Sequence, residues 1–224
     1  MNTIYPCIWF NDNAIEAAEF YSTVFEDVKI HDCTPMVVTF YIKGTQFMAL
    51  NGGPMFKPNP SISFFTVCKT EEEIDNAWDK LKEGGEILMP LDTYAWSARY
   101  GFIQDKYGVT WQLSLARENE EPAVFPSMMF TGAENGNAFK AINFYTSLFE
   151  NSKVEVIAEY EQGEQDTTGN IKYGQFNLEG FKVAVMDSSM PHHFGFNEGV
   201  SFVVNCHTQE EIDFFWLNLS DGGK

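Results

Sequence analysis

The spacing of apolar and polar side chains along the chain predicts short strands alternating with amphipathic helices. Four apolar runs have the length and composition of strands: residues 4–10, 37–42, 46–50 and 62–68. Apolar side chains recur at helical spacing at Ala14, Ala17, Tyr21 and Phe25. A second helix is expected to begin at Thr70, because Thr70 and Glu73 have the spacing of a capping box, and to end at Gly84. The pattern therefore indicates an α+β fold.

The same order of elements occurs twice. Residues 17–30 resemble residues 141–154, and residues 63–75 resemble residues 201–213, so Thr208 and Glu211 repeat the capping box of Thr70 and Glu73. The separation between equivalent residues grows along the chain, which indicates insertions in the second copy. Most of the inserted residues fall in the polar stretch 161–170, which has the composition of an extended hairpin loop.

Three segments follow from this duplication. Residues 1–116 are expected to form the first module, residues 117–125 a polar linker, and residues 126–224 the second module. The first copy continues into Asp105–Leu115, where Asp105 and Gly108 fit a type I turn and a strand with alternating side chains follows. The second copy stops at Lys224 without this segment.

We therefore expect the second sheet to lack its last strands. A bare sheet edge favours pairing with another chain, so we expect a homodimer partner, or a strand of the first copy, to cover it. The alternative is that the natural chain continues for roughly thirty residues beyond Lys224, as the first copy does.

The composition is acidic, with 32 Asp and Glu against 14 Lys and Arg and a formal net charge of −18. This charge opposes binding to nucleic acid or to an anionic membrane, so neither partner is expected. The four cysteines have neither zinc-site spacing nor the density of a disulfide scaffold. No window has the length of a membrane span and no leader precedes the first strand, so we expect a cytoplasmic protein.

Three separated motifs carry a resemblance to a known family: residues 9–21, 49–64 and 105–112, which read WFNDNAIEAAEFY, ALNGGPMFKPNPSISF and DKYGVTWQ. They resemble the PhnB-like family, often labelled 3-demethylubiquinone-9 3-methyltransferase-like. That family belongs to the vicinal-oxygen-chelate superfamily, with glyoxalase I and the bleomycin-resistance proteins. The resemblance implies tandem βαβββ modules whose curved, mostly antiparallel sheets face a cavity.

In metal-using members of this superfamily, the resemblance places the ligands at Pro6, Ala49, Ser61 or Ser63, and Gln112. Proline, alanine and a neutral amide cannot replace imidazole or carboxylate donors, so no metal is expected. No glycine-rich turn links a strand to a helix, as a dinucleotide or S-adenosylmethionine site would require, so no cofactor is expected either.

If Pro6 takes the cavity-facing position of the family, alternation puts Ile8 and Phe10 on the same inner face, with Cys7 and Trp9 under the helices. The expected cavity wall consists of Pro6, Ile8, Phe10, Phe47, Ala49, Asn51, Ser61, Ser63, Thr110, Gln112 and Ser114, with Tyr94, Trp96, Arg99 and Tyr100 at the rim. The alternative is that these aromatic residues only fill the core, and that Arg99 forms a surface ion pair.

The residue pattern and the resemblance together predict a metal-independent PhnB-like protein that binds a small organic molecule, with no residue assigned a catalytic role. Two alternatives stay open. The chain could be an enzyme of the superfamily, either a lyase or isomerase or the labelled methyltransferase. It could also be a drug-sequestering resistance protein. A histidine or carboxylate converging on the ligand would favour an enzyme, whereas an aromatic and amide lining would favour a binding protein.

Overall fold

The computed structural model describes residues 4–221, in which four α-helices accompany thirteen strands. The helices are α1 (Ala14–Val24), α2 (Glu71–Leu81), α3 (Ala138–Leu148) and α4 (Gln209–Ser220), with a short 3-10 turn at Gly132–Glu134. The first eight strands are β1 (Ile4–Phe10), β2 (Lys29–Cys33), β3 (Val37–Ile42), β4 (Thr45–Asn51), β5 (Ile62–Cys68), β6 (Glu86–Tyr94), β7 (Ser97–Gln104) and β8 (Thr110–Leu115). The others are β9 (Ala123–Thr131), β10 (Ser152–Glu159), β11 (Ile171–Leu178), β12 (Phe181–Ser188) and β13 (Val200–Val204). Among these residues, no helix combines the length and the apolar character needed to cross a membrane.

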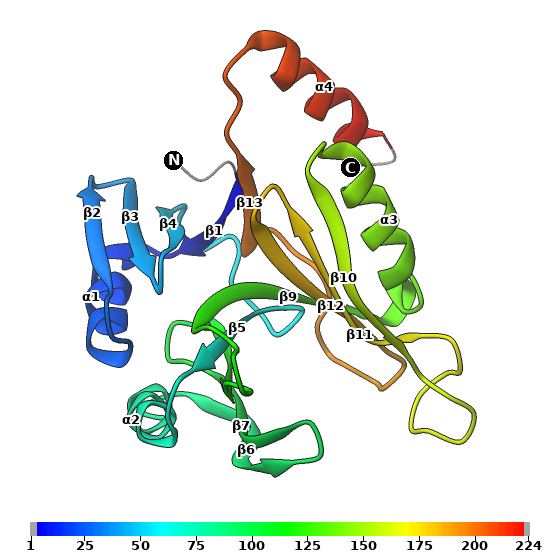
Figure 1. Cartoon of the computed structure of the whole chain (residues 1–224). Helices are drawn as coiled ribbons and strands as arrows, with labels where there is room; N and C mark the ends of the chain where they lie inside the picture. Colours follow the sequence, from blue (N-terminus) through cyan, green and yellow to red (C-terminus); the bar gives the residue numbers. More distant parts are fainter. Residues whose placement is uncertain (1–3, 222–224) are drawn as a thin grey trace.

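The strands form two sheets, and each sheet contains strands from both copies of the repeat (Figure 1). Sheet A has the order β13-β1-β4-β3-β2, and sheet B has the order β10-β11-β12-β9-β5-β8-β7-β6. In sheet A, β13 joins β1 in antiparallel register, and in sheet B, β9 joins β5 in the same way. The copies are therefore held together by main-chain hydrogen bonds as well as by side-chain packing.

The main core lies between α1 with sheet A and one face of sheet B. Trp111 of β8 is fully buried there, with its ring centroid 5.1 Å from that of Tyr21 on α1 and 5.4 Å from that of Phe64 on β5. Phe47 of β4 reaches the same cluster through Phe64, at 5.0 Å. Aromatic pairs at these distances stabilise a core beyond the apolar area they bury.

A buried carboxylate closes this core at the turn before β8. The backbone N–H of Gly108 donates to the Asp105 carbonyl at 2.9 Å, which confirms the expected tight turn. One Asp105 side-chain oxygen accepts from the backbone N–H groups of Tyr107 and Val109, and the other accepts from the Tyr21 hydroxyl and the Trp111 indole, both at 2.9 Å. Burial raises the pKa of Asp105 to about 6, although these four hydrogen bonds act in the opposite direction.

The duplication extends to the way the helices begin. Thr70 accepts a hydrogen bond from the backbone N–H of Glu73 at 3.1 Å, and Thr208 accepts one from that of Glu211 at 3.2 Å, as the sequence predicts for both copies. Helices α2 and α4 therefore start in the same way, so the difference in their exposure does not come from their N-termini.

Within residues 4–221, no strands of the second copy cover α4 in the way that β7 and β8 cover α2 in the first copy. Helix α2 packs on β7 and β8, and the ring of Trp78 lies where a Cβ at Gly101 would be only 2.5 Å away. The equivalent helix α4 has no such cover in the described part of the chain. Trp78 is 7% exposed, whereas Trp216 and Leu217 of α4 are 72% and 70% exposed. Strand β13 is an end strand of sheet A, so its outer edge is also open within residues 4–221.

Candidate functional site

Sheet B has a second face, opposite the main core, that carries small polar side chains. We call it the Gln112 face, and its polar members are Ser61, Ser63, Thr110, Gln112, Ser114 and Ser127, all buried. Ser63 lies opposite Thr110 on one side and opposite Ser127 on the other, so these three side chains form one row across the sheet. The next row pairs Phe65 with Gln112 and with Phe125. A polar row therefore borders an aromatic row at the centre of the sheet.

Gln112 is held rigidly at the centre of this face. Its Oε1 accepts from the Tyr100 hydroxyl at 2.7 Å, its Nε2 donates to the Ser63 hydroxyl at 2.8 Å, and its side chain is 3% exposed. Burial raises the pKa of Tyr100 far above its usual range, so this phenol stays neutral and donates. Because Trp111 points into the core, alternation along β8 explains why a glutamine follows a tryptophan here.

Three further hydroxyl groups, those of Ser97, Ser114 and Thr110, lie on or beside the same face. Ser97 and Ser114 share a hydrogen bond between their hydroxyl oxygens at 3.1 Å, which links the start of β7 to the end of β8. The Thr110 Oγ1 is buried, and within residues 4–221 it has no hydrogen-bond partner. A buried polar atom without a partner costs stability, so this position would gain from a bound water or ligand.

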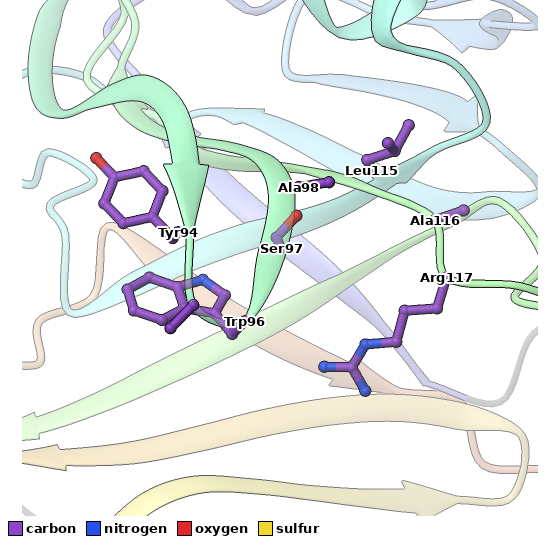
Figure 2. A pocket seen from close by; sticks show the side chains of 8 residues that line it. Tyr94, Trp96, Ser97, Ala98, Leu115, Ala116 and Arg117 are labelled. Atoms are coloured by element: carbon purple, nitrogen blue, oxygen red, sulfur yellow. The ribbon is translucent and has the colours of Figure 1, made fainter.

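A hollow of about 280 Å³ opens beside the Gln112 face, at the β6–β7 turn. Its lining residues are Tyr94, Ala95, Trp96, Ser97, Ala98, Leu115, Ala116 and Arg117. The rings of Tyr94 and Trp96 stack at 5.0 Å, and Tyr100 meets Trp96 edge-on at 5.7 Å. Figure 2 shows the Arg117 side chain extending towards Trp96. The hollow is thus joined to Gln112 through Tyr100.

The structure divides the residues of the expected cavity wall. Ser63, Thr110, Gln112 and Ser114 lie together on the Gln112 face, and Ser61 precedes them on the same side of β5. Trp96 lies at the rim of the adjoining hollow. These residues remain the candidate site.

The other predicted wall residues lie elsewhere, which corrects that part of the expectation. Ile8, Phe10, Phe47 and Ala49 belong to the main core with α1, and Pro6 alternates with Ile8 on β1. Asn51 accepts from the backbone N–H of Ala14 and so caps α1. Helix α1 therefore covers the face of β1 that the resemblance predicts to line the cavity. Trp9 lies on the other face of β1, where its indole N–H donates to the Gly53 carbonyl. Strand alternation fixes which residues share a face, but it does not say which face the helix covers.

Arg99 is also absent from the hollow, because it points to α2, where its Nε donates to Asp75 at 2.7 Å. The ion pair that was the alternative for Arg99 is therefore what the structure shows. The cation beside the hollow is Arg117, which the sequence places in the polar linker. Its only signal in the sequence is that it follows the strand carrying Gln112, with Ala116 between them.

The residues at the family's ligand positions do not fit a divalent metal. Pro6 and Ala49 offer no donor side chain, and the Gln112 amide is already bonded to Ser63 and Tyr100. In the described range 4–221, no three His, Cys, Asp or Glu side chains come together in a group suited to a metal ion. The side chains at these positions therefore do not support a metal-dependent step like that of glyoxalase I.

Paired βαβββ units that share curved sheets define the glyoxalase fold of the vicinal-oxygen-chelate superfamily. Glyoxalase I from Zea mays superposes with a TM-score of 0.60 and 11% identity, over 98% of this chain and 82% of that chain, which shows the fold. The family model described as 3-demethylubiquinone-9 3-methyltransferase matches residues 2–114 and 122–224, so the chain belongs to this family.

Two solved bacterial structures match about half of the chain. The PhnB protein from Bacillus cereus is 36% identical over 51% of this chain and 100% of that chain, with a TM-score of 0.48. A protein from Staphylococcus aureus is 30% identical over 52% of this chain and 98% of its own, with a TM-score of 0.25. No curated protein matches the chain.

Proposed function

We propose that this protein binds a small organic molecule in the hollow at Trp96, beside the Gln112 face, and that it does so without a metal. The observation that carries the proposal is the connected arrangement of Trp96, Tyr100 and Gln112, in which the exposed Trp96 ring contacts Tyr100 and the Gln112 amide fixes the Tyr100 hydroxyl. Small-molecule sites combine an apolar wall with a few fixed polar groups in this way. The buried Thr110 hydroxyl also supports the proposal, because within residues 4–221 it has no hydrogen-bond partner and so leaves one polar atom of the Gln112 face unsatisfied.

Binding is favoured over catalysis by the chemistry of the lining. The residues around the hollow include no histidine, carboxylate or cysteine that could act as a general acid, base or nucleophile. A hollow of about 280 Å³ is also at the small end of ligand sites, which leaves little room for both a methyl donor and an acceptor. We therefore place binding, or sequestration, ahead of the methyl transfer named by the family description.

A neutral aromatic probe, 2-naphthamide, tests this proposal by isothermal titration calorimetry. We expect one saturable site per chain, and about tenfold weaker binding in Trp96→Leu because ring stacking is lost. Phe139→Leu, which changes an exposed ring on α3, should bind the probe like the original chain. Elemental analysis of the same dialysed sample should find far less than one zinc, nickel or iron per chain. Unchanged binding in Trp96→Leu, or one equivalent of metal, would contradict the proposal.

We also propose that the chain forms a homodimer through β13 and α4. An open strand edge and an apolar helix face lie next to each other in the sequence, and a twofold axis would let each pair with its own copy. The exposed apolar residues of α4 are Ile212, Phe214, Trp216, Leu217 and Leu219. Exposed apolar side chains in this number are typical of a surface that is buried in an assembly.

Sedimentation velocity at micromolar concentration checks this expectation. The original chain should sediment as a dimer, and the double substitution Trp216→Glu and Leu217→Glu should give a monomer because it buries charge at the interface. Met55→Glu, an equally exposed apolar position at 76%, should leave the dimer intact. A monomeric original chain would rule out a second copy as the partner of this surface.

A further inference from the structure

One side of the hollow is formed by the guanidinium group of Arg117, which has no ion-pair or hydrogen-bond partner within residues 4–221. Four cations of the chain are engaged in ion pairs: Lys43 with Glu73, Lys82 with Asp79, Arg99 with Asp75 and Lys172 with Glu164. Within the described residues, no ion pair or hydrogen bond engages the Arg117 guanidinium. The nearby Glu120 carboxylate accepts from the Arg117 backbone N–H instead, at 3.0 Å. Arg117 is exposed and Glu120 lies beside it, but within residues 4–221 no carboxylate is ion-paired with its guanidinium, so this group is free to pair with an anionic ligand in the hollow.

The opposite side of the hollow is a fixed aromatic surface. Trp96 is 53% exposed, yet its ring stacks on Tyr94 at 5.0 Å with an angle of 26°. The Tyr94 hydroxyl donates to the Pro90 carbonyl at 2.9 Å, which anchors the stack to β6. A large aromatic ring that is both exposed and held in position is suited to stack with a flat ligand.

We infer that the hollow selects a flat aromatic molecule with a single carboxylate, an inference that rests on the proposed binding function. A ring placed on Trp96 would direct its carboxylate to the Arg117 guanidinium, which Figure 2 shows extending towards Trp96. A guanidinium matches the two oxygens of a carboxylate with paired hydrogen bonds. A single negative charge is favoured over a phosphate ester, because the net charge of −18 repels each additional negative charge on the ligand.

The neighbouring polar groups do not compete for this carboxylate. The Ser97 hydroxyl donates to the Arg99 carbonyl at 2.9 Å and is also bonded to Ser114. Gln112 is bonded to Tyr100 and Ser63. Arg117 is therefore the residue that decides whether the site prefers the anion to a neutral ligand of the same shape.

Two probes of nearly equal shape separate charge from stacking: 2-naphthoate and 2-naphthamide, titrated calorimetrically at about 150 mM salt, where surface charges are well screened. We expect 2-naphthoate to bind at least tenfold more tightly than 2-naphthamide, because a charge-assisted bidentate hydrogen bond replaces a neutral contact. Arg117→Gln should abolish this preference and leave 2-naphthamide unaffected. Arg99→Gln makes the same change of charge on the α2 side of β7, so it serves as the matched control and should keep the preference.

Each outcome of this experiment is informative. Equal affinities for the two probes in the original chain, or a preference that survives Arg117→Gln, would overturn the assignment of an anionic ligand while leaving binding at Trp96 in place. An equal loss of preference in Arg99→Gln would also overturn it, since overall charge would then explain the effect. If neither probe binds, the proposed function itself fails, and the inference fails with it.

Discussion

Replacing Asp105 by alanine is expected to lower the free energy of unfolding by about 4 kcal/mol or more. Four donors converge on this carboxylate, from Tyr21, Trp111, Tyr107 and Val109. Each buried donor that loses its acceptor costs roughly 1–3 kcal/mol, and alanine leaves all four without one. The turn before β8 and the contact between α1 and sheet B would be weakened together, since Asp105 joins them.

Urea denaturation followed by circular dichroism at pH 7.5 measures this loss. The control is Asp75→Ala, which removes a half-exposed carboxylate from its ion pair with Arg99 and should cost less than about 1 kcal/mol. If the alanine variant does not fold, Asp105→Asn, which keeps one acceptor for the backbone N–H groups, provides the measurement. A loss of less than about 1 kcal/mol in either Asp105 variant would show that the four hydrogen bonds contribute little.

The second large effect is a dependence of stability on pH that comes from the same carboxyl group. Burial raises the pKa of Asp105 from 3.8 to about 6 in the folded protein, so the folded state holds this proton at a pH where the unfolded state has released it. The stabilisation from this group is therefore fully present below about pH 4 and is lost as the pH rises through 6. A shift of this size corresponds to about 3 kcal/mol in total, of which about 1 kcal/mol falls between pH 5 and pH 7.

A comparison with Asp105→Asn isolates this contribution, because asparagine does not titrate. The difference in unfolding free energy between the original chain and this variant should grow as the pH is lowered from 7 to 5. The measurement stays above the sequence pI of about 4.4, where solubility falls. If the difference in unfolding free energy stays constant over this pH range, the pKa of Asp105 in the folded protein is not raised to about 6.

Local patterns predicted the elements of this fold well, because strands and helix caps depend on residues that are close in sequence. Strand β5 was expected at residues 62–68 and is found at Ile62–Cys68, and the caps at Thr70 and Thr208 are formed. The alternation of Trp111 and Gln112 placed each on the correct side of β8 relative to the other. These features follow from the period of the strand and from capping chemistry.

The candidate site was predicted only in part, because its assembly depends on long-range packing. The partners of Gln112 come from β5 and β7, and alternation could identify Ser63 but not the Tyr100 hydroxyl as the donor. Ile8 and Phe47 were assigned to the wall because the strand pattern does not show which face α1 covers. Arg117 was missed, since a single cation in a polar stretch has no periodic signal.

The pairing of β1 with β13 has a consequence for how the chain folds. Cys7 lies opposite Ser201, so β1 is synthesised long before β13, the strand that completes its pairing in sheet A. The pairings at the centre of sheet B close much shorter loops, since Ser63 of β5 lies opposite Thr110 of β8 and Ser127 of β9. Because closing a long loop costs more entropy than closing a short one, sheet B would order first and sheet A would close last. During synthesis, the apolar side chains of β1 are therefore covered by α1 and β4 alone until β13 has been made.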